Sequence, residues 1–407
     1  MVKKMQESSQ AYIAKRNSNN SKNILTVALY ALMLIYAVSF TMIGPMMSIL
    51  IRHYQLRISQ GGLMVTYQSI GGIVSIILGG ILADNFKKSK LIGIGFGLYS
   101  IALFVISLTP SYLLLLMVFF ILGASTKLVD TVTNSYIADL HSDNRGKFLN
   151  FLHVFFGAGA LIGPLFSRYL ISKGVNWSQC FLYLWVASTA IFLIYIAMLL
   201  LIPDLHDKKS STVTTGFLKV LSNLKIWILC LIIFMYAGHQ SGINIWFPMY
   251  AETVLKVSTL LSSLSLSIFW AGIILGRLLC IKLQQKYNVR HILFLGSLLG
   301  GSVLISGILT QNPSLILASV GLAALFTGAT IPMLIAIACS LFPRNSGAAS
   351  SILFFNNSIA WILFPWLIGI IAEYSNFQSG MLLTGVSLLI TSLASIAIPS
   401  TKDDIDG

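Results

Sequence analysis

The chain has 407 residues, of which 56% are hydrophobic and only 9% are charged, and its formal net charge is +14. About a quarter of the residues in soluble globular domains are charged, so this composition excludes an ordinary soluble enzyme or binding domain. The basic residues lie between apolar runs and not in one basic stretch, which argues against a nucleic-acid partner.

The sequence begins with a polar segment, residues 1–22, that is rich in Ser, Asn, Gln and Lys. The apolar run that follows it is too long for a signal peptide and has no small-residue cleavage site. We therefore expect residues 1–22 to be a mobile cytoplasmic tail that leads into a first membrane span.

Twelve apolar runs follow, and each is long enough for a transmembrane helix, which needs about 20 mostly apolar residues. A spanning segment must satisfy its own backbone groups and the runs show no strand alternation, so we expect helices. Six runs lie near residues 24–51, 60–83, 91–109, 112–138, 148–172 and 178–202. Six more lie near residues 225–251, 258–281, 290–310, 313–342, 347–373 and 379–399.

The runs divide evenly around a polar stretch that contains Pro203, Asp204 and Asp207. We expect an all-α integral membrane fold with twelve transmembrane helices in two pseudo-symmetric six-helix bundles, residues 23–202 and 225–400. A cytoplasmic linker, 203–224, would join them, and residues 401–407 would form a short cytoplasmic tail.

The distribution of Lys and Arg predicts the orientation, because basic residues are retained in short cytoplasmic loops. With the N-terminus inside, about 20 of the 26 basic residues fall on cytoplasmic segments. We therefore expect a multi-pass protein of the cell membrane with both termini in the cytoplasm.

The two halves also repeat each other weakly, at an offset of about 200 residues. Gly80–Leu82 at the end of the second run matches Gly276–Leu278 at the end of the eighth, and Pro164 in the fifth run matches Pro365 in the eleventh. Duplicated six-helix halves are typical of transporters and imply a central site between them.

Ionisable side chains within a membrane are costly, so each one marks a candidate functional position. Lys127 and Asp130 are three residues apart in the fourth run, and Asn134 lies one turn further on the same face. In one interpretation Asp130 changes protonation during transport, with Lys127 and with His239 of the seventh run taking part. Two alternatives stay open: a permanent ion pair that holds the helix in place, and a Lys127 that binds an anionic substrate.

Amide side chains suit hydroxyl-rich ligands, and aromatic rings stack on the apolar face of a sugar ring. The alternative for each such residue is helix packing or lipid contact. His153 of the fifth run is interpreted as a satisfied structural histidine. The expected substrate-binding residues are Tyr36, Asn134, Phe156, Gln240, Asn244, Trp270, Asn356, Asn357 and Trp361.

Several other kinds of chemistry are not indicated. The four cysteines, Cys180, Cys230, Cys280 and Cys339, have no metal-ligand spacing and are interpreted as small buried hydrophobes. The chain has no Walker loop and no convergent set of nucleophile, acid and base, so we expect no enzyme, no cofactor and no metal. The expected partners are a small-molecule substrate, protons and the lipid bilayer, with no nucleic acid, and we expect a monomer.

The segment from Gly79 to Lys90 reads Gly-Gly-Ile-Leu-Ala-Asp-Asn-Phe-Lys-Lys-Ser-Lys. It resembles the G-x-L-a-D-r-x-G-r-k loop between the second and third helices of the major facilitator superfamily, with Asn and Lys in place of the usual Arg and Gly. The resemblance covers residues 24–400 and implies alternating access. A carboxylate at the cytoplasmic mouth can accept charge-assisted hydrogen bonds and so latch the halves together. The expected latch residues are Asp84, Lys87, Lys88 and Arg277; alternatively, Asp84 only ends a helix beside a basic loop.

Four segments resemble a narrower branch of that superfamily, which contains fucose and glucose proton symporters. They are Val129–Ser135, Leu152–Leu161, Tyr236–His239 and Phe269–Arg277. An acidic residue in the fourth helix of that branch is linked to proton coupling, and Asp130 occupies the matching position. The first run here has no acid, and His239 and Gln240 stand where many sugar-transporting relatives carry one.

The expectation that follows is a secondary active transporter that moves a small solute by alternating access, as a proton-coupled sugar or polyol symporter. The segment Gly159–Pro164 resembles part of a fifth-helix motif of drug antiporters. Efflux of a drug or amphipathic molecule by proton antiport is therefore the alternative.

Overall fold

The computed structural model describes residues 2–85, 87–141, 145–201, 217–342 and 345–398. Side chains are described within these ranges except at 2–21, 76–85, 138, 145–147, 150, 201, 217–218 and 346–347. All regular secondary structure in the described ranges is helical.

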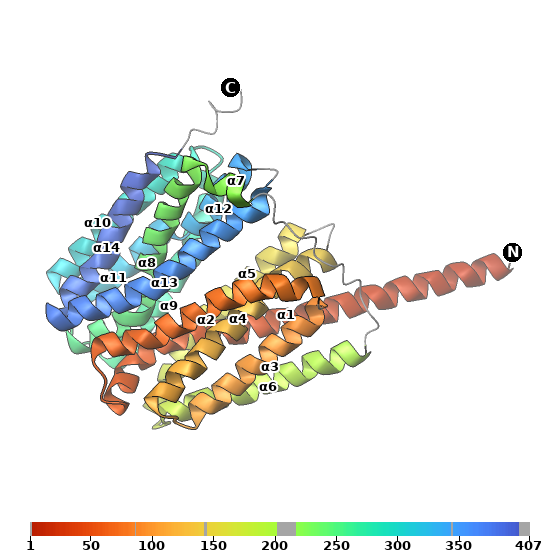
Figure 1. The fold of residues 1–407 in the computed structure, drawn as a ribbon, viewed down its shortest axis with the longest axis horizontal. Coiled ribbons are helices and arrows are strands. Elements are labelled where there is room, and N and C mark those ends of the chain that lie inside the picture. The colour runs from red at the N-terminus through yellow and green to blue at the C-terminus, as the bar shows by residue number, and fades with distance from the viewer. Residues whose placement is uncertain (1, 86, 142–144, 202–216, 343–344, 399–407) are drawn as a thin grey trace.

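The helices form two groups that lie side by side in Figure 1. The first group is α1 (Val2–His53), α2 (Ile58–Asn85), α3 (Lys88–Ser107), α4 (Tyr112–Leu140), α5 (Arg145–Ser172) and α6 (Trp177–Leu201). The second begins with the short α7 (Phe217–Leu221) and continues with α8 (Leu224–Thr253), α9 (Thr259–Leu283), α10 (Val289–Thr310) and α11 (Pro313–Thr327). It ends with α12 (Thr330–Leu341), α13 (Ser346–Tyr374) and α14 (Phe377–Ser395).

Eleven helical segments in the described part of the chain are long and apolar enough to cross a membrane. Helix α2 corresponds to the remaining expected span, and its side chains from residue 76 onward lie outside the described residues. The prediction of an all-α integral membrane fold is confirmed. Helix α1 already begins at Val2, ahead of the first apolar run.

The apolar run at 313–342 differs from the expected continuous helix, because it is broken between α11 and α12 at Gly328 and Ala329. A Cβ at Gly328 would lie 2.5 Å from the backbone oxygen of Ile273, so only glycine fits against α9 there. The guanidinium of Arg277 donates from Nε to the Gly328 carbonyl at 3.2 Å and satisfies the end of α11. Pro332 has no N–H to donate to this carbonyl, which lies four residues earlier, so the break has a local cause as well as the contacts with α9.

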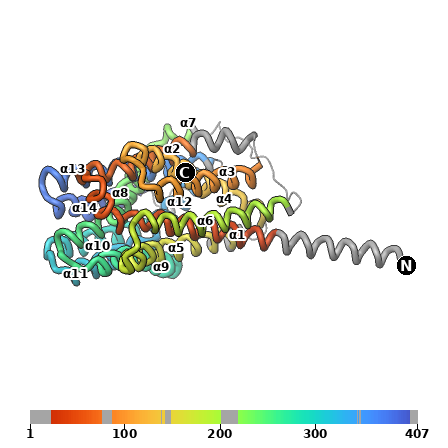
Figure 2. Tube along the Cα trace, turned by 90° about the horizontal axis from the view of Figure 1, so that it is seen from below, coloured from red at the N-terminus to blue at the C-terminus, as the bar shows by residue number. Residues whose placement is uncertain are grey.

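Within the first half, α1, α5 and α6 run along one another, as Figure 2 also shows. Buried hydroxyl groups join the helices: Tyr99 of α3 donates to Ser39 of α1 at 2.8 Å, and Ser100 lies 2.7 Å from Thr189 of α6. Such bonds satisfy polar atoms that lipid could not satisfy.

The halves are joined by two hydrogen bonds that the internal repeat relates to each other. Thr66 of α2 donates to the carbonyl of Ile362 in α13 at 3.0 Å, and Ser267 of α9 donates to the carbonyl of Leu161 in α5 at 2.9 Å. The two donors differ by 201 positions, and so do the two acceptors. The weak repeat in the sequence is thus expressed as equivalent contacts on both sides of the interface.

Further contacts between the halves gather at the end of the molecule away from the termini. Ser59 of α2 donates to the Glu373 carboxylate at 2.6 Å, and Ser48 of α1 donates to the Glu252 carboxylate at 3.0 Å. We call this end the closed end. At Gly44 of α1 a Cβ would lie only 1.9 Å from the backbone oxygen of Asn244 in α8, so the two helices touch closely there.

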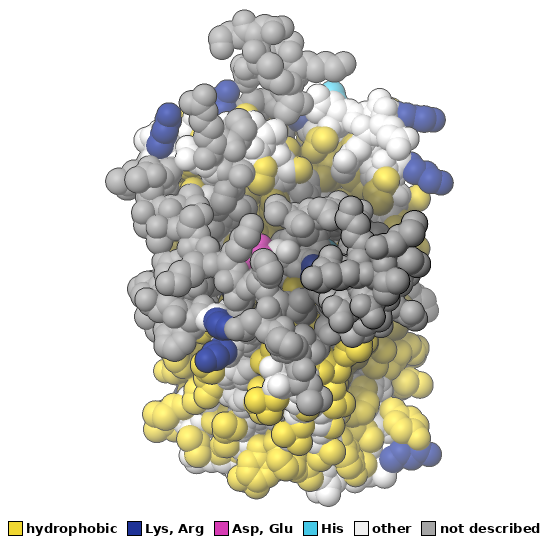
Figure 3. Space-filling model, turned by 90° about the vertical axis from the view of Figure 1, so that its right-hand side faces the viewer, with side chains coloured by type: hydrophobic (Ala, Val, Ile, Leu, Met, Phe, Trp, Pro, Cys, Tyr) yellow, Lys and Arg dark blue, Asp and Glu magenta, His cyan; other side chains and the backbone are white. Residues whose placement is uncertain are grey.

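Figure 3 looks at the molecule from the right-hand side of Figure 1. Lys and Arg side chains appear at separate points around its outline, and hydrophobic side chains cover its lower part. The visible basic residues do not form one continuous patch.

Candidate functional site

A cavity of about 260 Å³ lies between the two halves. Its lining comes from α1, α2, α4 and α5 of the first half and from α8, α9, α12 and α13 of the second. A central cavity that both halves build is the arrangement that alternating access requires.

The charged centre of the cavity is on α4. Lys127 Nζ lies 3.4 Å from Asp130 Oδ2, and Asn134 Nδ2 donates to Asp130 Oδ1 at 3.0 Å. The side chains of Lys127 and Asp130 are each 24% exposed, so the pair is accessible from the cavity. Lys127 Nζ also lies 5.8 Å from the centre of the Phe354 ring on α13, which makes this pair a contact between the halves.

Besides Phe354, five aromatic side chains from both halves lie around the same cavity. The Tyr36 and Phe156 ring centres are 5.6 Å apart, Phe156 and Trp270 are 5.9 Å apart, and Phe40 and Trp361 are 5.1 Å apart. Rings with these spacings present both faces and edges to a ligand.

Amide side chains complete the polar part of the lining. Gln240 and Asn357 both line the cavity, and Asn357 Oδ1 has no hydrogen-bond partner among the described residues. Asn244 lies behind them: it accepts a hydrogen bond from Trp270 Nε1 at 3.1 Å and donates to the Gln240 carbonyl at 2.8 Å. It therefore holds the Trp270 ring in place from outside the lining.

Four expected site residues lie outside the cavity lining: Asn134 and Asn244, whose contacts are given above, and Asn356 and His239. Asn356 donates to Cys230 Sγ at 3.2 Å and to the Ile352 carbonyl at 3.0 Å, within the second half. His239 is 1% exposed and packs beside the rings of Tyr236 and Phe269. Neither ring nitrogen of His239 has a hydrogen-bond partner among the described residues.

Of the four expected latch residues, Lys88 forms hydrogen bonds within its own half. Lys88 is 7% exposed and donates to Asp139 at 2.7 Å and to Ser135 at 2.6 Å, both on α4 of its own half. Lys87 is exposed, and the Asp84 side chain lies outside the described residues. Arg277 lines the central cavity.

The cavity also contains residues that the sequence interpretation did not include as binding residues. Phe40 and Gln68 line it, and so does His153, which is exposed there and not enclosed in the protein interior. Phe40 follows Tyr36 by four residues and so shares its helix face. A search for every amide within an apolar run would have found Gln68.

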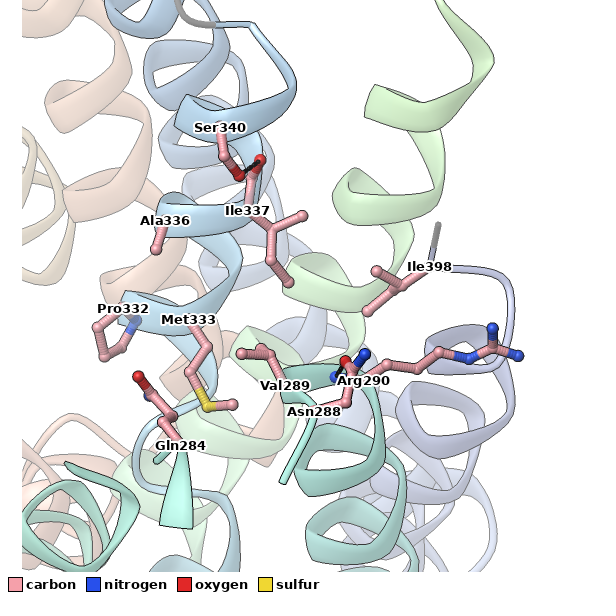
Figure 4. A pocket seen from close by; sticks show the side chains of 10 residues that line it. All are labelled: Gln284, Asn288, Val289, Arg290, Pro332, Met333, Ala336, Ile337, Ser340 and Ile398. Carbon is pink, nitrogen blue, oxygen red and sulfur yellow. Dashed lines mark hydrogen bonds between the residues drawn. The ribbon is translucent and has the colours of Figure 1, made fainter. Parts of the chain in front are cut away.

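A second cavity, of about 300 Å³, lies within the second half, between the end of α9, the start of α10, and α12 (Figure 4). Asn288 caps α10 there by accepting from the Arg290 backbone at 2.9 Å, and the Arg290 side chain points away from the other labelled residues. Because one half alone builds this cavity, it is not the alternately exposed site. No cluster of three or more potential metal ligands occurs among the residues that the structure describes.

Comparison with known proteins identifies a family match over most of the chain. The model of the Major Facilitator Superfamily matches residues 29–300 and 263–405.

Curated relatives are distant in sequence. The chain is 25% identical over 257 residues to a "Protein TsgA homolog" of Buchnera aphidicola, an alignment that covers 63% of this chain and 65% of that relative. The chain thus spans just under two thirds of that relative's length. It is 22% identical over 333 residues to the glucose/mannose transporter GlcP of Bacillus subtilis, covering 79% of this chain and 80% of that protein.

Solved structures share the fold at low sequence identity. A bacterial homologue of the human lysosomal transporter Spinster, in an inward-facing and unoccupied conformation, has a TM-score of 0.75 at 16% identity, covering 93% of this chain and 97% of that one. A D-xylose–proton symporter has a TM-score of 0.75 at 18% identity, with coverages of 94% and 98%. The E. coli fucose:proton symporter has a TM-score of 0.61 at 17% identity, with coverages of 94% and 100%.

Proposed function

This chain belongs to the major facilitator superfamily and is therefore a secondary transporter and not an enzyme, and we propose that it carries a sugar or related polyol together with protons. The observation that carries the proposal is the composition of the central cavity. It combines one carboxylate with amides and aromatic rings from both halves. Amides bind hydroxyl groups and rings stack on sugars, while an accessible carboxylate can take up a proton.

Asp130 is the proposed proton-coupling residue. Its carboxylate is held by Lys127 and Asn134, so protonation would remove the partner of the Lys127 ammonium. Lys127 also contacts the Phe354 ring of the other half, and this contact must change when the two halves move relative to each other. Protonation of Asp130 therefore acts, through Lys127, on an interaction that differs between conformations. Proton binding and the movement of the halves are coupled through this single lysine.

The proposed binding residues are those that the cavity brings together: Tyr36, Phe156, Gln240, Trp270, Asn357 and Trp361. Asn134 and Asn244 act indirectly, by orienting Asp130 and Trp270. The distant sugar-transporting relatives, a glucose/mannose transporter among them, support this substrate class.

The proposed orientation places both termini in the cytoplasm, which follows from the excess of Lys and Arg on that side. The contacts between the halves at Ser48 and Ser59 then seal the outer side. In this orientation the cavity of the present conformation belongs to an inward-facing state.

The test is uptake of labelled sugars into proteoliposomes with and without an imposed pH gradient. Asp130→Asn keeps the shape of the side chain but cannot ionise, so gradient-driven accumulation should fall to the level without a gradient. Exchange of substrate across the membrane should survive, because binding and movement of the halves remain possible.

Asp139→Asn is the matched control, because Asp139 lies on the same helix and pairs with Lys88 outside the cavity. At equal amounts of folded protein this control should retain driven uptake. Undiminished accumulation by Asp130→Asn would remove Asp130 from the coupling mechanism. If no sugar is transported and lipophilic compounds are, drug efflux by proton antiport becomes the better proposal.

A further inference from the structure

The central cavity carries more positive than negative charge. Its described lining contains two permanent cations, Lys127 and Arg277, and one carboxylate, Asp130. His153 also lines it. Without a ligand, one cation of the described lining therefore has no matching anion.

The carboxylate of Asp130 is already occupied. Lys127 lies 3.4 Å from one of its oxygens, and the Asn134 amide donates to the other at 3.0 Å. No ion pair involving Arg277 occurs among the described residues. Asp130 thus neutralises Lys127, and Arg277 is the uncompensated charge.

Arg277 is held in a way that leaves its guanidinium free for a ligand. Nε donates to the carbonyl of Gly328 at 3.2 Å, where the break between α11 and α12 exposes a helix end. This bond fixes the plane of the guanidinium and leaves its two terminal amino groups without a carboxylate in the described part of the chain. A planar fork with two free donor groups matches a carboxylate, which it can bind through two parallel hydrogen bonds.

We propose that the substrate is an anionic sugar derivative, a sugar acid, whose carboxylate binds Arg277; this inference rests on the proposed transport function of the same cavity. When the cavity closes around its substrate and loses water, an unpaired guanidinium is strongly unfavourable. A neutral sugar leaves Arg277 in that state, whereas a carboxylate neutralises it. Gln240 and Asn357, on α8 and α13, then remain for the hydroxyl groups.

The test compares pairs of ligands that differ only in the acid group, such as glucose with glucuronate and galactose with galacturonate. Binding is followed through the fluorescence of the purified protein, because Trp270 and Trp361 line the cavity. At about pH 8, where an ordinary histidine is neutral, the acid of each pair should bind at least about tenfold more tightly.

Arg277→Gln removes the charge, so the affinity for the acids should fall at least about tenfold while that for the neutral sugars changes little. Arg277→Lys should retain part of the preference, because it keeps the charge but loses the planar fork. Arg290→Gln is the matched control: Arg290 lies at the second cavity (Figure 4) and does not line the central one, so this change should leave both affinities unchanged.

Two results would overturn the inference: equal affinity of the unmodified protein for the acid and the neutral sugar, or an equal loss of both affinities in Arg277→Gln. In either case, pH-driven uptake of the neutral sugar would still support the proposed function. Absence of binding and uptake for both members of every pair would count against both proposals.

Discussion

At the scale of single residues, His141 joins three helices near the end that bears the termini. Its Nε2 lies 2.7 Å from Thr26 Oγ1 of α1, and its ring lies flat on Phe148 of α5, with centres 3.4 Å apart. Burial and the nearby Lys22 ammonium lower the pKa of His141 below its usual value. The folded protein therefore favours the neutral imidazole at this contact.

This shift predicts a loss of stability in mild acid. Because the pKa is lower in the folded than in the unfolded chain, the contribution of His141 is fully present above its unfolded pKa of about 6.5. It is lost as the pH falls from there through the lowered value, since the unfolded chain then binds the proton more readily. Thermal unfolding in detergent should show a steeper fall in midpoint between about pH 8 and 5.5 for the unmodified protein than for His141→Gln. Equal slopes would contradict this assignment.

The charged centre could be predicted from sequence spacing, whereas the choice among neighbouring amides could not. Lys127, Asp130 and Asn134 share a helix face at any orientation of α4, and the structure brings them together. Asn356 and Asn357 are adjacent, so they point about 100° apart on α13, and only the packing of the helix decides which of them meets the cavity. Arg277 is held at the cavity by the Gly328 carbonyl, which lies between α11 and α12. The residues around position 277 contain no pattern that predicts this contact.

At the scale of helices, the close approach of α1 and α8 depends on Gly44. A Cβ there would lie 1.9 Å from the Asn244 carbonyl oxygen, and backbone cannot move aside as a side chain can. Gly44→Ala should therefore disfavour the present conformation relative to one in which the closed end has opened. The expected result is a shift in the conformational equilibrium together with slower transport.

The shift can be measured by labelling Ser263→Cys with a membrane-impermeant thiol reagent. Ser263 is 1% exposed and lies at the closed end, beside a small cavity formed by α1, α5, α8 and α9. Labelling should be several times faster with Gly44→Ala than without it. Gly93→Ala is the matched control, because a Cβ at Gly93 meets its nearest atom at an ordinary 3.4 Å. Equal labelling rates in the two variants would show that the α1–α8 contact does not control this end.

The helices themselves could largely be predicted from the sequence, because a membrane leaves one solution for an apolar run of about 20 residues. The interruption at Gly328 has a local signal that the sequence interpretation did not use, because Pro332 lies four residues later and has no N–H to donate to the Gly328 carbonyl. The short α7 falls in the segment expected to be a linker, and its five residues are too few for their apolar spacing to predict a helix. The close approach of Gly328 to the Ile273 backbone, in contrast, depends on tertiary packing that no local pattern reveals.

At the scale of the whole molecule, the internal repeat predicted two similar halves, and the structure adds how they meet. Two hydrogen bonds related by the same offset of 201 positions, from Thr66 and from Ser267, stand on opposite sides of the interface. Which conformation the protein adopts could not be predicted from the sequence, because one sequence must support every state of an alternating-access cycle at similar free energies. Contacts that are present in only one state decide which state is populated.

The contacts at the closed end are candidates for such state-specific interactions. Glu252 and Glu373 belong to the second half, and each accepts a hydrogen bond from a serine of the first, Ser48 at 3.0 Å and Ser59 at 2.6 Å. Arg57 of the first half adds a weaker, exposed ion pair to Glu373 at 3.7 Å. Hydrogen bonds to charged groups contribute roughly 1.5–3 kcal/mol each, so losing both is enough to change which state predominates.

The double variant Ser48→Ala and Ser59→Ala removes both donors and leaves the carboxylates in place, so the closed end should open in a larger fraction of molecules. Spin labels at Ser111 and Ser314, which are exposed at the starts of α4 and α11 in different halves, report this opening. The variant should add a population at longer distance. Ser172→Ala with Ser222→Ala is the matched control, because in the part of the chain that the structure describes both hydroxyls bond only to carbonyls of nearby residues. An unchanged distance distribution would mean that the backbone contacts at Thr66 and Ser267, and the packing around them, hold this end closed without the carboxylates.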